Sequence, residues 1–250
     1  MQETTPTLQD QAAYWDGWNS RARSGHLPPT SRRQGELVED LVAGLGRRDL
    51  EIIDVGCGTG WMSERLLPFG RVLGVDITAA TIAQAAARVP QARFLCADIH
   101  DAGLPVAHFD VAVCLEVLAH VSEQPAFVRR LATLLRPGGC LILATQNRPV
   151  LERWSAVSSP DRHQIRHWVD RGELRTLLEP CFEQVRIRSI VPVGDRGLLR
   201  LVNSPRLNAA LARLVDPARI ERVKERCMLG HSLVATATRR GGRSVTSPRR

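Results

Sequence analysis

The chain has 250 residues, of which 44% are hydrophobic, so it is long and apolar enough to bury the core of a single domain. No apolar run approaches the ~18 residues that a membrane span needs, and the polar N-terminus lacks the regions of a signal peptide. We therefore expect a cytoplasmic protein whose six scattered cysteines are packed thiols rather than disulfides or zinc ligands.

The formal net charge of +8 suggests a nucleic-acid partner only if the basic residues are gathered on the fold. Five arginines lie in residues 239–250, and the rest of the chain has a formal charge of +3. The Gly, Ser, Pro and Arg content of this tail predicts disorder. We expect a solvated end, with weak association to an anionic surface as the alternative, and no nucleic-acid partner.

Residues 8–45 are predicted to form two helices. The first contains Tyr14, Trp15 and Trp18, and the second runs from about Ser31 to Leu45. Trp15 and Trp18 are three residues apart, so they share one helical face. They either line a substrate pocket or anchor the helix to the core.

Residues 51–60 combine an apolar strand, which carries Asp54, with a glycine-rich loop at Gly56, Gly58 and Gly60. Glycine has no Cβ and tolerates positive φ, so a ligand can lie directly against the backbone of such a loop. A dinucleotide fingerprint would need its last glycine at position 61, where this chain has Trp61. The loop therefore disfavours NAD or FAD and favours S-adenosylmethionine.

Acidic residues follow the next two predicted strands. Residues 72–75 end at Asp76, which is 22 residues after Asp54, close to the ~20-residue separation at which an acid meets ribose hydroxyls. A carboxylate can accept two hydroxyl hydrogen bonds at once. The strand over residues 94–96 is followed by Asp98, which on its own would more often cap a helix than bind a ligand.

Two more strands are predicted further along the chain. The first covers residues 109–115 and leads into Glu116 and His120; the second covers residues 140–144 and follows a helix stop and tight turn over residues 135–139. Later strands are expected at residues 185–190 and 233–237, with a helix over residues 173–178. The alternation of strands and helices indicates a doubly wound α/β fold.

The motif Asp-Val-Gly-Cys-Gly-Thr-Gly and its strand context, over about residues 50–147, resemble class I S-adenosylmethionine-dependent methyltransferases. Residues 145–148, and His163 ten residues before Glu173, further resemble the O-methyltransferases of ubiquinone biosynthesis. The resemblance implies a Rossmann-like, seven-stranded, mostly parallel sheet with an antiparallel last strand. We place this methyltransferase domain at residues 46–238, after a helical cap at 1–45 and with a helical insertion at about 192–229.

The resemblance also implies a cofactor site for S-adenosylmethionine, whose product is S-adenosylhomocysteine. Asp98 would accept from the adenine amino group, Ile77 would cover the base, Asp76 would bind the ribose, and Glu116 would steady the methionine end or a substrate hydroxyl. The sequence offers no convincing cluster of acids and amides for a metal site, so we expect none. The full set of candidate cofactor residues is Asp54, Gly56, Cys57, Gly58, Gly60, Asp76, Ile77, Asp98, Ile99 and Glu116.

Substrate choice is expected in three segments outside the common core, since the N-terminal helices cover cofactor and substrate in the resembled group. One is residues 8–45, another is residues 148–170, and the third is the insertion. The insertion has arginines between apolar positions and is either a cap helix or a helix that binds an anionic surface or substrate. The substrate candidates are Tyr14, Trp15, Trp18, Trp154 and His167.

Methyl transfer to an oxygen benefits from a general base, and histidine is the usual one. His120 is our choice because it follows the fourth strand, where the sheet ends face a ligand. The alternative is that His120 is a polar cap bonded to the backbone, with His163 or His167 as the base instead.

The resemblance favours an enzyme that methylates a small molecule, on an oxygen of a phenolic, quinone-precursor or secondary-metabolite acceptor. Nitrogen or carbon acceptors are the first alternative, because the same scaffold serves them with different pocket residues. An RNA methyltransferase or a non-catalytic partner with this fold are further alternatives. Oligomeric state stays open between monomer and homodimer.

Overall fold

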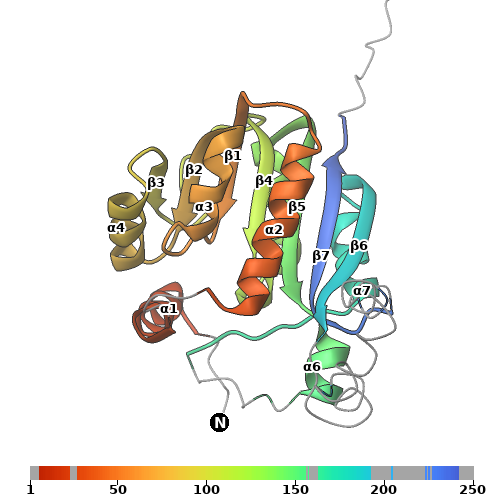
Figure 1. Ribbon diagram of the computed structural model, residues 1–250. Coiled ribbons are helices and arrows are strands. Elements are labelled where there is room, and N and C mark those ends of the chain that lie inside the picture. The colour runs from red at the N-terminus through yellow and green to blue at the C-terminus, as the bar shows by residue number, and fades with distance from the viewer. Residues whose placement is uncertain are drawn as a thin grey trace, which may run out of the picture.

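The computed structural model describes residues 6–22, 27–155, 157, 163–192, 204, 223, 225 and 227–241. A seven-stranded sheet runs through its centre, with helices on both faces (Figure 1). Most of the expected helical insertion and of the basic tail lies outside the described residues. The strands are β1 (Leu50–Val55), β2 (Gly70–Asp76), β3 (Arg93–Cys96), β4 (Phe109–Leu115), β5 (Leu135–Gln146), β6 (Phe182–Pro192) and β7 (Gly230–Arg239).

The strands lie in the order β3-β2-β1-β4-β5-β7-β6. The pairs among β1 to β5 are parallel, and β7 is antiparallel to both of its neighbours, β5 and β6. This confirms the expected Rossmann-like sheet with an antiparallel last strand. Because β1 lies next to β4 while β2 and β3 extend the other way, the strand order reverses between β1 and β4, and open α/β sheets bind ligands at such a point.

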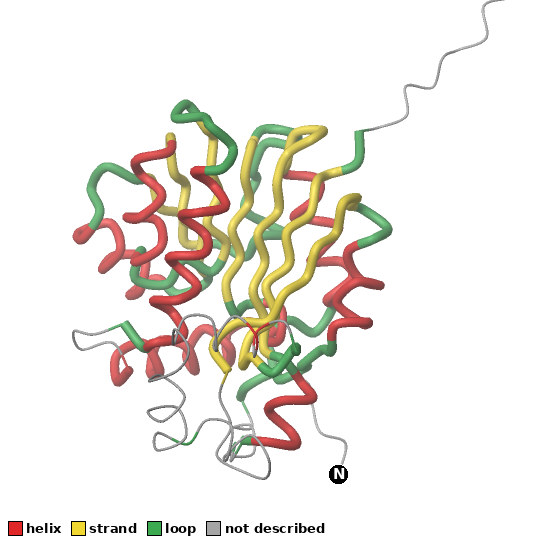
Figure 2. Tube along the Cα trace, turned by 45° about the vertical axis from the view of Figure 1, so that its right-hand side comes forward, coloured by secondary structure: helices red, strands yellow, loops and turns green. Residues whose placement is uncertain are grey.

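Two layers of helices cover the sheet, and the 45° turn in Figure 2 shows helices to either side of the strands. Helices α2 and α3 pack on one face through apolar residues such as Val38 and Met62, whereas α5 and α7 pack on the other through Leu131 and Leu174. The helices are α1 (Leu8–Ala22), α2 (Pro29–Ala43), α3 (Trp61–Leu66), α4 (Ala79–Arg88), α5 (Gln124–Leu134), α6 (Arg148–Trp154) and α7 (Arg171–Leu178), with 3-10 helices η1 (Leu67–Phe69) and η2 (Leu118–His120).

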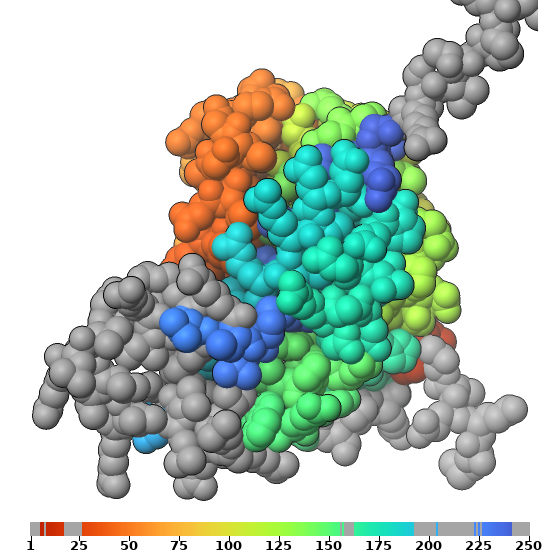
Figure 3. Space-filling model, turned by 90° about the vertical axis from the view of Figure 1, so that its right-hand side faces the viewer, coloured from red at the N-terminus to blue at the C-terminus, as the bar shows by residue number. Residues whose placement is uncertain are grey.

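The central strand β4 shows why the sheet is buried on both faces. Its residues from Val111 to Cys114 are all fully buried, as expected for a parallel strand between two helical layers. The edge strand β6 differs, since the charged residues Glu183, Arg186 and Arg188 are exposed along it. Charges of this kind discourage pairing with another chain. Figure 3 views the molecule from the side of β6 and α7.

The expected elements that lie within the described residues are present, and two of them differ notably in extent. Helix α2 runs from Pro29 to Ala43, whereas we expected about Ser31 to Leu45, because prolines are well suited to the first helical positions. Strand β5 begins at Leu135, so the expected turn over residues 135–139 is wrong as a strand boundary. Gly138 still has a φ of 81°, and pairing with β4 shifts register between Phe109 and Val111.

Candidate active site

A cavity of about 830 Å³ lies at the carboxyl ends of the parallel strands. Its lining includes the glycine loop after β1, the residues that follow β2, β3 and β4, parts of α1 and α2, and residues 164–166 and 168. In Figure 1, α1 and α6 lie below the sheet, on the side of these strand ends. The site is therefore built where the strand order reverses and is covered by segments from both halves of the chain.

The glycine loop has a backbone that other residues would not adopt easily. Gly56, Gly58 and Gly60 have φ values of 71°, 53° and 76°. The amide of Gly56 donates to the carbonyl of Val75 at 2.8 Å, which ties the loop to β2. A Cβ atom added at Gly56 would also overlap Cγ2 of Val117. The loop thus presents bare backbone of Gly56 and Gly58 to the cavity.

Asp76 is held in place by the loop that it faces. Its Oδ2 accepts from the amide of Gly58 at 3.0 Å, and its Oδ1 accepts from the amide of Thr78 at 3.0 Å. The carboxylate lines the cavity. Two carboxylate oxygens offer about four acceptor positions, so two remain for the hydroxyls of a ligand.

Asp98 lies one strand further along the same edge. Its Oδ1 accepts from the amide of His100 at 2.7 Å, so the side chain orders its own turn and still lines the cavity. Ile77 and Ile99 also line the cavity and supply apolar surface next to this carboxylate. The structure therefore brings together the two acids and the apolar residues that the sequence placed at separate strand ends.

Three of the candidate cofactor residues do not line the cavity. Asp54 is buried and accepts a hydrogen bond from the hydroxyl of Ser63 at 2.7 Å, which links β1 to α3. Gly60 is the residue that precedes the first turn of α3. Cys57 is buried, and burial raises the pKa of its thiol well above its ordinary value, so it stays a neutral packed thiol.

Glu116 follows β4 and has a φ of 62°, which is uncommon for a residue other than glycine. Its Oε1 accepts from the side-chain amide of Gln34 in α2 and from the hydroxyl of Ser232 in β7, the latter at 2.6 Å. Burial raises the pKa of this carboxyl. Glu116 lines the cavity together with Gln34.

His120 combines a bond to the backbone with a place in the cavity. Its Nδ1 lies 2.8 Å from the carbonyl oxygen of Ile165, so Nδ1 carries the hydrogen and Nε2 is left without one. Its ring lies edge-on to the ring of Trp15, with 4.5 Å between centroids. Burial, with a smaller contribution from the charge of Arg166, lowers the pKa of His120 to about 4. The ring is therefore neutral near pH 7.

The remaining substrate and base candidates lie at different places. Trp15 lines the cavity, and Tyr14 packs edge-on against it at 5.0 Å between centroids. His163 lies near α1, with its Nδ1 3.7 Å from Oδ1 of Asp10. Tyr14, Trp154, His163 and His167 do not line the cavity. The side chain of Trp18 lies outside the described residues.

Several residues that line the cavity, or that hold a lining residue in place, were not expected from the sequence. Gln34 and Ser232 hold Glu116 from 82 and 116 residues away in the chain, and Trp168 was noted only as part of a variable segment. Gln11, from α1, is buried and lines the same cavity. No local motif surrounds these positions, since each reaches the site only through the packing of its own helix, strand or loop.

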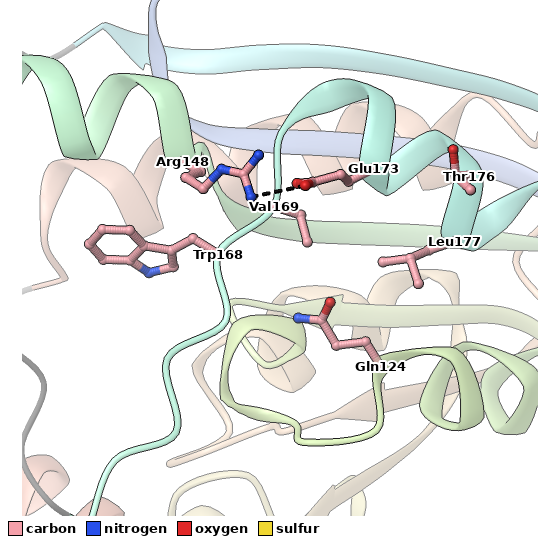
Figure 4. Close-up of a pocket in the computed structure, with 7 residues that line it drawn as sticks. All are labelled: Gln124, Arg148, Trp168, Val169, Glu173, Thr176 and Leu177. Atoms are coloured by element: carbon pink, nitrogen blue, oxygen red, sulfur yellow. Dashed lines mark ion pairs between the residues drawn. The ribbon is translucent and has the colours of Figure 1, made fainter.

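A second hollow, of about 400 Å³, lies on the other side of Trp168 and Val169 (Figure 4). Arg148 and Glu173 point toward one another in it and form an ion pair at 2.9 Å, and Arg148 also pairs with Asp170. These charges are satisfied by one another, so we assign no ligand to this hollow. Trp168 lines both this hollow and the larger cavity.

The residues around the larger cavity fit an adenosyl cofactor. A loop that cannot carry a Cβ at Gly56 allows close backbone contact, and two carboxylates on neighbouring strand ends match a ribose and an adenine amino group in turn. Across the described ranges, no three His, Cys, Asp or Glu side chains gather as a metal site would require. None of the described helices has the length and apolar character needed to cross a bilayer.

Fold and site together define an α/β protein with a cavity suited to a nucleoside-containing ligand at the point where the strand order reverses. The model of the family described as "Methyltransferase domain" matches residues 53–143. A ubiquinone biosynthesis O-methyltransferase of Azorhizobium caulinodans is 30% identical over 180 residues, which are 66% of this chain and 68% of that protein. The chain belongs to the class I S-adenosylmethionine-dependent methyltransferases, and S-adenosylmethionine is its cofactor.

Other relatives agree on the family and are matched over a shorter stretch. A ubiquinone biosynthesis O-methyltransferase of Rhodopseudomonas palustris is 32% identical over 130 residues, which are 49% of each chain. The chain thus spans about half the length of several curated relatives that it matches. An S-adenosylmethionine-dependent methyltransferase structure from Mesorhizobium loti shares the fold, with a TM-score of 0.55 and 20% identity over 80% of this chain and 96% of that one.

Proposed function

We propose that this enzyme transfers the methyl group of S-adenosylmethionine to an oxygen of a small phenolic, quinone-precursor or secondary-metabolite acceptor. The observation that carries the proposal is His120, whose unprotonated Nε2 belongs to a neutral ring at the cavity, beside Trp15. A neutral imidazole nitrogen accepts a hydrogen bond from a hydroxyl group. The ubiquinone biosynthesis O-methyltransferases to which the chain is similar support oxygen over nitrogen or carbon as the methylated atom.

The cofactor roles follow from the order of the strand ends. We assign the ribose hydroxyls to Asp76, the adenine amino group to Asp98, and the faces of the base to Ile77 and Ile99. The backbone of the glycine loop would lie along the sugar and the methionine portion, and Glu116 would lie at the methionine end. When bound, the cofactor supplies a methyl group activated by its positively charged sulfur.

The protein's own contribution is orientation and control of a proton. Trp15 and Trp168 supply flat apolar surface in the cavity, suited to an aromatic acceptor. His120, fixed by Ile165, would hold the acceptor hydroxyl by its hydrogen so that the oxygen faces the methyl group. With a pKa of about 4, His120 accepts a hydrogen bond readily but holds a proton weakly above pH 5.

The test is a methyl-transfer assay with a panel of phenols, catechols, amines and carbon acids, and with mass spectrometry to locate the methyl group. We expect O-methylated products, and a loss of at least tenfold in kcat/KM for His120→Gln. His108→Gln is the matched control, because that ring is exposed beside Glu51 at the other end of β4. Products methylated only on nitrogen or carbon, or full activity in His120→Gln, would contradict the proposal.

The same purified protein can be used to test two alternatives, an RNA methyltransferase and a non-catalytic partner with this fold. Removal of residues 239–250 deletes the basic tail, and retained activity on a small molecule would count against an RNA substrate. A non-catalytic partner would bind the cofactor and transfer no methyl group to any acceptor of the panel. Gel filtration with light scattering decides between monomer and homodimer.

A further inference from the structure

Glu116 occupies the strand end where the sulfur of the cofactor is expected. The strand order β3-β2-β1-β4 places Asp98, Asp76, Gly56 and Glu116 in a row, and neighbouring strands are about 4.8 Å apart. An adenosyl cofactor whose adenine is at Asp98 and whose ribose is at Asp76 extends in the same direction. Its sulfur then lies near the ends of β1 and β4. This placement rests on the proposed cofactor roles.

The two carboxyl oxygens of Glu116 have different surroundings. Oε1 is occupied by the donors Gln34 and Ser232, which are themselves 2% and 0% exposed. Oε2 is buried and, among the residues that the structure describes, has no hydrogen-bond partner. A buried carboxylate oxygen without a partner costs free energy, so Oε2 needs either a proton or a charged ligand.

The backbone also indicates a functional position. Glu116 keeps its positive φ of 62° while its amide donates to the carbonyl of Ala144 at 2.8 Å. A residue other than glycine is strained in this region, and such strain is concentrated at active sites. Here it turns the side chain of Glu116 away from the continuation of β4 and toward Gln34 and Ser232.

Among the residues that the structure describes, no fixed cation dominates the surroundings of this carboxyl. Burial is the main influence and raises the pKa of Glu116; the Ser232 and Gln34 hydrogen bonds and the charge of His231 act in the opposite direction. Cys114, on β4, also lies within electrostatic range but is itself neutral, because burial raises its pKa. Neither lysine nor arginine is among the groups that act most strongly on Glu116.

We propose that Glu116 releases its proton when the positively charged sulfur of the cofactor binds, and takes up a proton when that sulfur becomes neutral. The carboxyl is ionised beside a sulfonium and protonated beside a neutral thioether. A positive sulfur would supply the charge that Oε2 otherwise lacks, and its disappearance would make the ionised form costly again. Glu116 is then a catalytic residue, since it contacts the reacting end of the cofactor.

The proton balance of the transfer follows directly. The oxygen–hydrogen bond of the acceptor breaks, a bond from that oxygen to the methyl carbon forms, and the electron pair of the carbon–sulfur bond stays on sulfur. The released proton ends on Oε2 of Glu116. His120 does not keep it, because its pKa is about 4. The proton leaves to solvent when the next sulfonium enters.

The test compares how the wild type binds S-adenosylmethionine and S-adenosylhomocysteine by calorimetry between pH 5 and pH 8, without any acceptor. The two ligands differ in the charge on sulfur. We expect the dissociation constant of S-adenosylmethionine divided by that of S-adenosylhomocysteine to rise, by up to tenfold for each pH unit, as the pH falls below the pKa that Glu116 has in the S-adenosylhomocysteine complex. Above that pKa the ratio should be constant. In Glu116→Gln the ratio should not depend on pH.

Two further variants separate Glu116 from its neighbours. His231→Gln should keep the pH dependence of the ratio, and Ser232→Ala, which removes a donor to the carboxylate, should move its onset to higher pH. A pH-independent ratio in the wild type, a dependence that survives in Glu116→Gln, or one that disappears in His231→Gln would overturn the inference. Failure of the wild type to bind either ligand would instead overturn the cofactor site, and this inference with it.

Discussion

Replacing His120 by glutamine should make the protein less sensitive to acid. The pKa of His120 is lowered from 6.5 to about 4 by burial, so between these values the unfolded chain binds a proton that the folded chain does not. The buried His120 therefore lowers the free energy of unfolding of the wild type below pH 6.5, by an amount that grows as the pH falls, and has no such effect above pH 6.5. At 1.36 kcal/mol per pKa unit the full effect is about 3 kcal/mol, of which about 2 kcal/mol is reached at pH 5.

The assay is urea denaturation of the wild type and of His120→Gln at pH 7.5 and pH 5.0. Other groups titrate in both proteins, so subtracting the two pH effects isolates the histidine. The wild type should lose about 2 kcal/mol more than the variant between these pH values. His108→Gln, at an exposed ring, should behave as the wild type. Equal losses in wild type and His120→Gln would show that His120 is not buried as a neutral ring.

Three further predictions concern the loop, the ribose acid and a helix cap. Gly56→Ala should destabilise the protein by about 1–3 kcal/mol and weaken cofactor binding at least tenfold, because Val117 occupies the space that the new Cβ would need. The control is Gly103→Ala, which is also at positive φ but has open space around it. Comparing the two variants by thermal melting and calorimetry separates backbone strain from steric overlap. Asp76→Asn should lower S-adenosylhomocysteine affinity at least tenfold by calorimetry and also lower the melting temperature, because its NH2 group cannot accept from one of the two backbone amides that Asp76 binds. Asp170→Ala should cost about 1 kcal/mol in urea denaturation, through loss of the α7 capping box, and leave cofactor affinity unchanged.

The parts of the fold that follow from local signals were predictable from the sequence. The glycine loop, Asp76 and Asp98 were placed together because each follows a parallel strand, and the carboxyl ends of such strands share one edge of the sheet. The start of β5 was not predictable in this way. Residues 135–139 do contain a turn-forming glycine, Gly138, but β5 pairs with β4 on both sides of it, at Leu135 and again from Cys140.

The acceptor side of the site was less predictable, since its residues meet only in the folded chain. The short sequence from Glu116 to His120 identified both polar groups after β4 but not what holds them. Gln34 and Ser232 come from α2 and β7, and Ile165 comes from a segment without regular structure. Spacing along the chain carries no information on such contacts, because it does not determine how distant elements pack.

The position of β7 has a consequence for the order in which the site is assembled. This strand comes after β6 in the chain but lies between β5 and β6 in the sheet. Until β7 has been synthesised, β5 and β6 each present an unpaired edge, and Ser232 is not there to hold Glu116. During translation, the residues after β1 to β3 that we assign to the cofactor can therefore take their places early, whereas Glu116, which we propose to lie beside the reacting methyl group, is fixed only when β7 completes the sheet.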